Sequence, residues 1–307
     1  MRMDRFITLR LVHPLRGALN RFCTVGGQVR DRGKALPILM YHSVSNEQEP
    51  KVHPYYRLAT TPHRFAEQMQ TLADLGYTGV SLEEALTLVA SGAGGIRPAA
   101  ITFDDGFRDF YTAAWPVLRR HRFTATVYLS TAYIAEQRKT FHGKECLTWT
   151  EVGELHRQRV RFGSHTVNHP ELYKLSWDEI ERELALSKTQ IEAELDEEIT
   201  SFAYPYAFPQ EAGAFTKRFK QLLRERGYQN CVTTIIGTMH KGDDAFALKR
   251  LPMNSCDDSA LFAAKLGGAY DWLSVVQYLF RNGKTWIKPP PQNVDLTASG
   301  ALVGLEK

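Results

Sequence analysis

The chain has 307 residues, of which 43% are hydrophobic and 23% are charged, and its formal net charge is +4. These proportions exclude an intrinsically disordered polypeptide, and no run approaches the roughly eighteen apolar residues of a membrane-spanning helix. The positive charge collects at the N-terminus without a recognised nucleic-acid-binding motif, which argues against a nucleic-acid partner.

The first 34 residues form a basic segment that differs from the rest of the chain. They hold seven arginines and one lysine against two aspartates, a net charge of +6. Apolar residues stand among the arginines at a rough helical spacing, but Arg10 and Pro14 interrupt them, unlike the apolar core of a cleavable signal peptide. We expect an N-terminal extension over residues 1–34 that packs on the rest of the protein or stays without regular structure. The alternative is an amphipathic helix on an anionic membrane surface.

Strand-like and helix-like segments alternate through the middle of the chain. Short apolar runs predict strands at Leu36–Tyr41, Ala99–Phe103, Phe123–Leu129, Val160–Phe162, Ile199–Tyr204, Gln229–Thr234 and Phe246–Leu251. Amphipathic stretches predict helices at His63–Leu75, Leu82–Val89, Phe107–His121, Trp177–Leu195 and Phe215–Arg226. This alternation favours an α/β fold with a parallel sheet, and the runner-up to a barrel is an open doubly wound sheet. No glycine-rich dinucleotide fingerprint follows an early strand, which disfavours the open form of a nucleotide-binding enzyme.

The predicted domain covers residues 35–285, including a helix at Trp272–Phe280, and a proline-rich tail follows at 286–307. Four cysteines stand without paired spacing, which predicts buried free thiols rather than disulfides or a zinc ribbon. Free thiols suit a reducing compartment. With no signal-peptide pattern either, we expect a cytoplasmic protein, with peripheral contact at the inner face of the membrane as an alternative.

Two adjacent aspartates end the strand predicted at residues 99–103. Asp104 and Asp105 are followed at once by Gly106, which marks a turn. Successive side chains of a strand point to opposite faces, so both carboxylates can serve one site only where the chain bends. Two carboxylates held close together repel each other unless a cation or a shared proton lies between them. The pair therefore indicates a metal site, acid–base chemistry, or both.

Two histidines follow the strand predicted at residues 160–162. His165 and His169 are four residues apart, and Pro170 disfavours a helical conformation for His169, so we expect both on a tight loop. Two imidazoles and one carboxylate make an open zinc site. Each pattern alone is common among turn and surface residues, but together, each at the end of a strand, they favour a metal site.

Three segments carry a resemblance to a known family. Thr102–Gly106, His165–Pro170 and Phe202–Tyr206 are similar, in order and rough spacing, to three motifs of the polysaccharide deacetylases, the nodulation-type deacetylases of carbohydrate esterase family 4. The resemblance covers roughly residues 36–256, and it implies a distorted parallel (β/α) barrel of about seven strands. In barrels of this type the site gathers at the C-terminal ends of the strands, where all three motifs fall.

The resemblance also implies a role for each motif residue. Asp105, His165 and His169 match the positions that hold one divalent metal ion, with Zn²⁺ first and Co²⁺, Ni²⁺ or Mn²⁺ as alternatives. Asp104 matches the general base that takes a proton from the attacking water. Tyr206 matches the residue whose backbone N–H stabilises the developing oxyanion.

A general acid must protonate the leaving amine, and here the chain departs from the common pattern. Most members of the family carry a Leu-x-His motif after the last strand, and no such motif follows residue 206. Met40-x-His42, at the end of the first predicted strand, has the same form and resembles the circularly permuted poly-N-acetylglucosamine deacetylases of biofilm systems. A closed barrel keeps its site when one strand moves from the end of the chain to its start. We therefore expect His42 to be the general acid, and the alternative is a structural histidine at a strand end.

The third motif has Ala203 where an arginine usually orients the catalytic base. Another cation must then hold Asp104, if any does. Arg250, beside the last predicted strand, is the candidate, and an arginine paired at the rim of the barrel is the alternative.

Together these features predict a metal-dependent amidase that removes an acetyl group from an N-acetylated amino sugar. The substrate is a polysaccharide or a lipid-linked glycan intermediate in exopolysaccharide or cell-envelope glycan synthesis, and the basic N-terminus offers peripheral contact with a membrane. The missing arginine leaves open a second function, a catalytically silent glycan-binding protein on the same barrel. A phosphate-ester hydrolase, the third alternative, generally needs more metal ligands than these three.

Overall fold

The fold is taken from a computed structural model, which describes residues 3–14, 35–49, 52, 57–92 and 95–282. The predicted tail at 286–307 and most of the extension at 1–34 lie outside the described residues. The division of the chain into three parts therefore stays a prediction.

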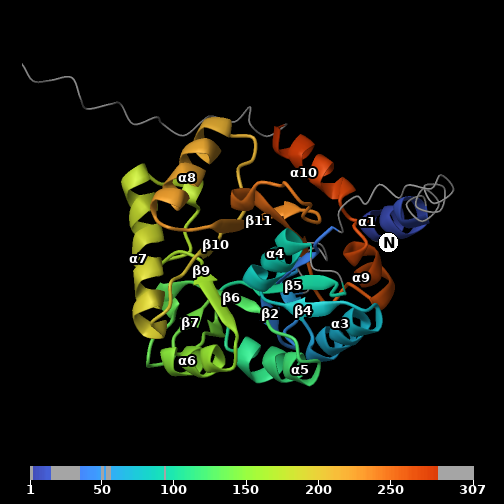
Figure 1. The fold of residues 1–307 in the computed structure, drawn as a ribbon, viewed down its shortest axis with the longest axis horizontal. Helices are drawn as coiled ribbons and strands as arrows, with labels where there is room; N and C mark the ends of the chain where they lie inside the picture. Colours follow the sequence, from blue (N-terminus) through green and yellow to red (C-terminus); the bar gives the residue numbers. More distant parts are fainter. Residues whose placement is uncertain (1–2, 15–34, 50–51, 53–56, 93–94, 283–307) are drawn as a thin grey trace, which may run out of the picture.

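Seven parallel strands close into a barrel (Figure 1). In spatial order they are β1 (Ile38–Tyr41), β12 (Leu248–Pro252), β11 (Asn230–Ile236), β10 (Ser201–Ala203), β9 (Arg161–Ser164), β6 (Thr126–Leu129) and β5 (Pro98–Phe103). The barrel closes because β5 also pairs with β1, with Leu39 opposite Ile101. This closure confirms the predicted (β/α) barrel and rules out the open sheet. Each of the seven predicted runs overlaps one of these strands.

The barrel is distorted at β5, which pairs with three strands. Its second half pairs with β6, while its first half pairs along the same edge with β4 (Thr78–Val80). The apolar pattern predicts no strand at β4, because the strand has three residues and Gly79 at its centre. A Cβ on Gly79 would lie 2.6 Å from the Ile101 side chain and 2.8 Å from the Phe123 ring, so the close packing of this strand requires glycine.

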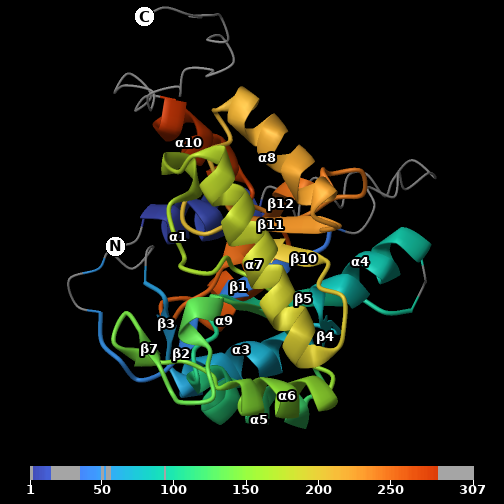
Figure 2. The same cartoon turned by 90° about the vertical axis from the view of Figure 1, so that its left-hand side faces the viewer.

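Among the described residues, eight α-helices surround or cap the barrel, several of them on its outside in Figure 2. They are α3 (Pro62–Asp74), α4 (Leu82–Ser91), α5 (Trp115–Arg120), α6 (Trp149–Arg157), α7 (Trp177–Leu195), α8 (Gly213–Glu225), α9 (Ser259–Leu266) and α10 (Trp272–Asn282). Hydroxyl side chains cap several N-termini, and Ser176 and Thr148 form complete capping boxes with Glu179 and Glu151. The helices α6 and α9 had no counterpart in the sequence prediction.

The helix predicted at Phe107–His121 is only partly correct. Regular α-helix begins at Trp115, and a π-helical turn, η3 (Phe110–Ala114), precedes it. Pro116 has no N–H to donate, so the preceding turn widens instead of continuing as a regular α-helix. Residues 107–109 form a turn that leads out of β5 and its two aspartates.

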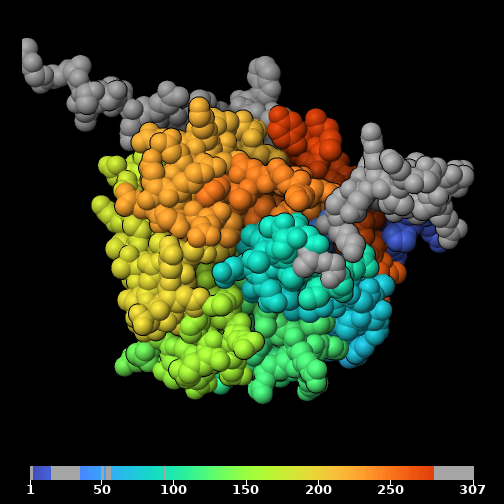
Figure 3. All heavy atoms as spheres, viewed as in Figure 1, coloured from blue at the N-terminus to red at the C-terminus, as the bar shows by residue number. Residues whose placement is uncertain are grey.

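The helix α4 covers the N-terminal end of the barrel. Its buried residues Leu82 and Ala85 join a cluster of inward-facing strand residues that includes Ile38, Ala100 and Val232. Figure 3 shows the side chains of α4 covering the middle of this end of the molecule. Side chains of a strand point alternately to its two faces. The inward-facing residues further along each strand therefore lie toward the C-terminal end of the barrel, away from α4.

The described N-terminal residues pack on the barrel. They form α1 (Met3–Ile7) and the π-helical segment η1 (Thr8–Val12). Asp4 accepts a hydrogen bond from the Tyr270 hydroxyl at 2.6 Å, and Thr8 Oγ1 accepts one from the Trp272 indole at 3.1 Å. Cys146 and Cys231 are buried free thiols as predicted, and Cys256 is half-buried. None of the described helices combines the length and apolar character that crossing a bilayer would require.

Smaller elements complete the rim of the C-terminal end. β2 (Ser43–Val44) pairs with β3 (Ala59–Thr60), and β7 (Thr140–Phe141) forms a hairpin with β8 (Lys144–Glu145). In the described part of the chain, the 3₁₀ turns η4 (Thr131–Tyr133) and η5 (Leu172–Lys174) lie in loops, and η6 (Ala245–Ala247) directly precedes β12 at the other end of the barrel. The hairpin and the loop that begins with β2 both contribute to the pocket described next.

Candidate active site

Three neighbouring strands bring together side chains that are far apart in the sequence. The strand β1 lies between β12 and β5, so His42 follows one strand, Asp104 follows its neighbour and Arg250 lies on the other neighbour. The register continues past the strand ends, where the N–H of Asp104 donates to the carbonyl of Tyr41 at 3.0 Å. The structure thus places the N-terminal histidine beside the first aspartate, the arrangement that a circular permutation implies.

Arg250 forms a two-pronged ion pair with Asp104 inside the barrel. Its Nη1 and Nη2 donate to the two carboxylate oxygens, each at 2.7 Å. Its Nε donates to the carbonyl of Thr233 at 3.0 Å, and Nη1 also donates to Thr102 Oγ1 at 3.2 Å. Arg250 is 1% exposed and Asp104 2% exposed. Burial alone would raise the pKa of Asp104, but the Arg250 guanidinium, assisted by His165, lowers it below its usual range.

His42 faces the same carboxylate. Its Nε2 lies 3.9 Å from Asp104 Oδ2, and 16% of its side chain is exposed. Burial lowers the pKa of His42 to about 4, against the opposing effect of Asp104. The imidazole is therefore neutral at pH 7.

Asp105, His165 and His169 form a second group in the same pocket. One ligand atom from each lies within 4.8 Å of the others, and Asp105 Oδ1 is 3.5 Å from the Nε2 atoms of both histidines. Tetrahedral zinc with bonds of about 2.0–2.1 Å separates its ligands by about 3.3 Å, so the spacing suits one ion. Among the described residues, this is the cluster of acids, histidines and cysteines that could hold a metal.

The electrostatics of this group also fit a cation. Asp105 Oδ1 is buried and has no hydrogen-bond partner in the described structure, which is costly for a carboxylate without a counter-charge. Burial and the neighbouring Asp104 raise the pKa of Asp105, an effect that a bound cation opposes. Burial lowers the pKa of both histidines, which leaves their nitrogen lone pairs free to act as ligands.

The second ring nitrogen of His165 fixes the direction of its imidazole. His165 Nδ1 lies 2.8 Å from the carbonyl oxygen of Ala203 and donates to it in the tautomer that leaves Nε2 free. A ligand histidine commonly donates its other N–H in this way. Ala203, which departs from the third motif of the family, therefore contributes its backbone to the metal group.

Unusual backbone angles let adjacent residues serve one site. Asp105 has φ 74° and Gly106 has φ 69°, so the chain turns sharply directly after Asp104. A Cβ on Gly106 would lie 2.9 Å from the Leu129 side chain, so this turn requires glycine for space as well as for its φ. The predicted loop between the histidines is confirmed, and it holds Thr166 at φ 70° and His169 at φ 53°.

Tyr206 lies over the metal group. Its φ is 55°, its ring centroid is 4.5 Å from that of His169, and the residue is 47% exposed. The carbonyl of Tyr206 accepts a hydrogen bond from Thr234 Oγ1 at 2.9 Å, which fixes the turn. Its own N–H has no acceptor within the residues that the structure describes, and the residue lines the pocket.

One cavity of about 380 Å³ lies at the C-terminal end of the barrel, and it is lined by His42, Asp104, Asp105, His165, His169 and Tyr206. Its wall also includes Arg57, His142, Met253 and Gln277, which the sequence analysis did not single out. Gln277 bridges α10 to the rim of β11 through hydrogen bonds with Ile236 N and Thr234 O. In the sequence, Arg57, His142 and Met253 are marked only by a place beside a predicted strand end or in a loop, and Gln277 only by a place in a predicted helix. Many other residues share these positions.

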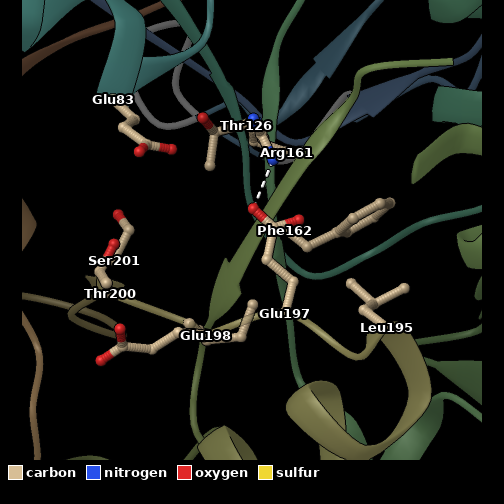
Figure 4. Close-up of a pocket in the computed structure, with 10 residues that line it drawn as sticks. Glu83, Thr126, Arg161, Phe162, Leu195, Glu197, Glu198, Thr200 and Ser201 are labelled. Atoms are coloured by element: carbon tan, nitrogen blue, oxygen red, sulfur yellow. Dashed lines mark hydrogen bonds and ion pairs between the residues drawn. The ribbon is translucent and has the colours of Figure 1, made fainter. Parts of the chain in front are cut away.

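A second hollow lies at the opposite end of the barrel, between β6, β9 and β10 (Figure 4). It encloses about 20 Å³, room for about one water molecule. Its Arg161 pairs with Glu197, and Glu83 and Glu198 line it as well (Figure 4). The hollow is therefore too small for a substrate.

Comparison with known proteins agrees with this geometry. The family model described as polysaccharide deacetylase matches residues 91–231, which include both aspartates, both histidines and Tyr206. Residues 91–231 form a polysaccharide deacetylase domain. The relatives include named deacetylases, and the protein is a hydrolase that acts on amide bonds. His42 and Arg250 lie outside the matched residues, His42 directly after β1 and Arg250 on β12.

Individual deacetylases support the assignment. YxkH of Bacillus subtilis, whose name places it among the polysaccharide deacetylases, is 29% identical over 230 residues, which are 75% of each chain. The structure of the Streptococcus pyogenes deacetylase PplD in complex with acetate has a TM-score of 0.64 at 25% identity, covering 76% of this chain and 98% of that one. A poly-β-1,6-N-acetyl-D-glucosamine N-deacetylase of Staphylococcus aureus is 25% identical over 152 residues. The chain spans about half the length of this relative, 52%.

Proposed function

We propose that the protein is a metal-dependent deacetylase that hydrolyses the N-acetyl amide of an amino sugar. The substrate in this proposal is a polysaccharide or a lipid-linked glycan intermediate in exopolysaccharide or cell-envelope glycan synthesis. The staphylococcal relative named for poly-N-acetyl-D-glucosamine deacetylation supports this choice of sugar. The observation that carries the proposal is the convergence of Asp104, His42 and the three candidate metal ligands in one cavity.

Asp105, His165 and His169 would hold the metal ion, with Zn²⁺ as the first choice. When bound, such an ion acidifies water and polarises the acyl oxygen. The remaining chemistry falls to side chains and backbone groups of the chain.

Asp104 would accept the proton that the attacking water loses. The Arg250 ion pair keeps its carboxylate ionised, and therefore able to accept a proton, at any pH near neutral. The same ion pair makes Asp104 a weak base, so Asp104 can accept a proton only from a water molecule whose own pKa has been lowered.

His42 would deliver a proton to the leaving nitrogen. The water oxygen bonds to the carbonyl carbon, the carbon–nitrogen bond breaks, and the nitrogen leaves as an amine after gaining one proton. His42 is neutral in the resting protein, and it lies 3.9 Å from the carboxylate that receives the water proton. His42 therefore acts as an acid after it has taken up the proton that the water lost to Asp104. The step needs no external proton source.

Tyr206 would stabilise the acyl oxygen as negative charge develops on it. Its N–H is free for this purpose within the described structure, and its position is fixed by Pro205 before it and by Thr234. The side-chain hydroxyl has no part in this step.

The arginine missing at residue 203 was the reason for considering a silent glycan-binding protein. Arg250 reaches Asp104 from β12 and makes two hydrogen bonds to it, so the missing arginine no longer favours that alternative. No other observation among the described residues supports a binding protein without turnover.

Release of acetate tests the proposal directly. Oligomers of N-acetylglucosamine and lipid-linked N-acetylated sugars would be incubated with the protein and zinc or cobalt, and with Asp104→Asn as the comparison. We expect acetate from the wild-type protein, loss of about a hundredfold or more in the variant, and loss after chelation that added metal reverses. Equal acetate release by both proteins on every substrate would contradict the assignment.

Peripheral membrane contact is the second part of the proposal. Three elements expose large apolar side chains: Met3, Phe6 and Leu11 on α1 and η1, and Val275, Tyr278 and Leu279 on α10. Each of the six is at least 43% exposed, and α10 also reaches the pocket through Gln277. The net charge of +6 on residues 1–34 would favour an anionic surface.

Vesicle binding tests this second part. Co-sedimentation with phosphatidylglycerol vesicles would be compared with phosphatidylcholine vesicles for Leu11→Glu, Leu279→Glu and the control Leu186→Glu. Leu186 is 48% exposed on α7, so it matches the others in exposure but lies on another helix. We expect about tenfold weaker binding to anionic vesicles for the first two variants only. Equal binding by all four proteins would contradict membrane contact through this surface.

A further inference from the structure

The loop that carries both candidate histidine ligands is held from two sides. The backbone N–H groups of Thr131 and Ala132 donate to the carbonyls of Thr166 and Val167 at 3.1 and 2.9 Å, and a carboxylate of α7 holds the loop from the other side. Glu183, on α7, accepts hydrogen bonds from the backbone N–H groups of Val167 at 2.7 Å and Asn168 at 3.0 Å through Oε2. Its other oxygen accepts from Asn168 Nδ2 at 2.7 Å. Val167 and Asn168 lie between His165 and His169, so the carboxylate binds the middle of the loop through hydrogen bonds.

The loop needs such support because its backbone is strained. Thr166 is β-branched and has φ 70°, and His169 has φ 53°. Each such residue costs about 1–3 kcal/mol, and the conformation persists only when its surroundings impose it. Within the loop, the N–H of His169 donates to Thr166 Oγ1 at 2.9 Å. This internal bond ties the two strained residues to each other but not to the rest of the protein.

A second hydrogen bond to α7 lies one helical turn after Glu183. Ser187 Oγ lies 2.6 Å from Ser164 Oγ, and Ser164 is the last residue of β9 before the loop. Glu183 and Ser187 therefore fasten the loop and the strand that enters it to the same helix face. Glu183 has no ion pair with any lysine, arginine or histidine in the described chain, so its carboxylate is used by the loop.

We infer that Glu183 is a positioning residue that sets the affinity of the site for its metal. It touches neither the substrate nor the metal group, and it acts by holding His165 and His169 at the separation that matches Asp105. This inference rests on the metal dependence in the proposed function. Groups that orient metal ligands typically account for tenfold to a hundredfold in affinity.

Glu183→Gln tests the inference with little change in shape, because the amide keeps one acceptor but turns a donor toward the loop. Zinc affinity would be measured by competition with a chromophoric chelator, together with thermal unfolding of the metal-free protein. We expect affinity about tenfold weaker, with most of kcat restored at saturating zinc. Glu183→Ala serves as the second variant and should weaken zinc binding at least as much.

Glu179→Gln is the matched control on the same helix. Glu179 completes the capping box with Ser176, so its loss should lower the stability of α7 without changing zinc affinity. Equal zinc affinity of the wild-type protein and both Glu183 variants would overturn the inference but leave the proposed function intact. An equal loss of affinity in Glu179→Gln would also overturn it, because general destabilisation would then explain the effect. A wild-type protein that binds no zinc, cobalt, nickel or manganese would overturn both.

Discussion

Arg250 and Asp104 are 146 residues apart in the sequence, yet two hydrogen bonds of 2.7 Å join them inside the barrel. The contact exists because β1 separates their strands by a single position and the barrel is closed. A buried carboxylate without this partner would hold its proton to a higher pH. The ion pair is therefore central to the predicted behaviour of the base.

Replacing Arg250 should change both activity and stability. In Arg250→Met the pKa of Asp104 rises, so the carboxylate is protonated at low pH and regains activity only as the pH increases. We expect kcat/KM to fall and its acidic limb to move to higher pH, and we expect a loss of about 3–5 kcal/mol in the free energy of unfolding. Activity–pH profiles and denaturant unfolding would measure these effects. Arg161→Met, at the other end of the barrel, should leave the profile in place.

His42 can be tested through the chemistry of the leaving group. An amine leaves an amide only after protonation, whereas an activated phenolate leaves an ester without it. In His42→Gln we expect acetate release from an N-acetylated sugar to fall by about a hundredfold or more, and hydrolysis of an aryl acetate to fall much less. The kcat of both reactions would be compared. Equal losses on the two substrates would point to a structural role for His42 instead.

The free energy of unfolding at acidic pH should depend on Glu151. The Glu151 carboxylate accepts hydrogen bonds from Thr148 N, Arg108 and Arg138. Burial alone would raise the pKa of Glu151, but these interactions, with that of Arg138 the largest, lower it. Because the folded pKa lies below the unfolded value of about 4.3, the stabilisation is present above that pH and disappears as the pH falls further.

Thermal unfolding of Glu151→Gln at several pH values checks this dependence. We expect a loss of about 1–3 kcal/mol at pH 7 that shrinks below about pH 4. Glu145→Gln is the control, because Glu145 pairs with the same two arginines but has a 54% exposed side chain. Its loss should be under about 1 kcal/mol. A constant difference for Glu151→Gln at every pH would show that its charge is not the cause.

Gly163 should be intolerant of a side chain. A Cβ there would lie 2.5 Å from the Tyr128 ring and 2.8 Å from the carbonyl oxygen of Ser201, and neither has room to move inside the barrel. Gly163→Ala should therefore destabilise the protein by about 1–3 kcal/mol. Gly213→Ala, where no atom lies within 4 Å of the added carbon, should be neutral or slightly stabilising. Equal midpoints of denaturant unfolding for the two variants would contradict the packing argument.

The sequence was informative where local pattern and function coincide. Apolar runs located the seven barrel strands, and the acids and histidines at their ends located the candidate site. The strand β4 was not predicted, because three residues with a glycine at the centre show no periodicity in their apolar pattern. Arg250 could be named only as a candidate, because its pairing with Asp104 depends on closure of the barrel. Glu183 gave no signal at all, since a glutamate on an amphipathic helix is ordinary until the loop that it holds is seen.

The closure of the barrel by α4 has a consequence for turnover under the proposed function. Because α4 covers the N-terminal end, no product can leave through the middle of the barrel, and substrate and both products must pass the C-terminal end. Acetate that stays beside the candidate metal ligands would then occupy the place of the next acetyl group until it leaves by that end.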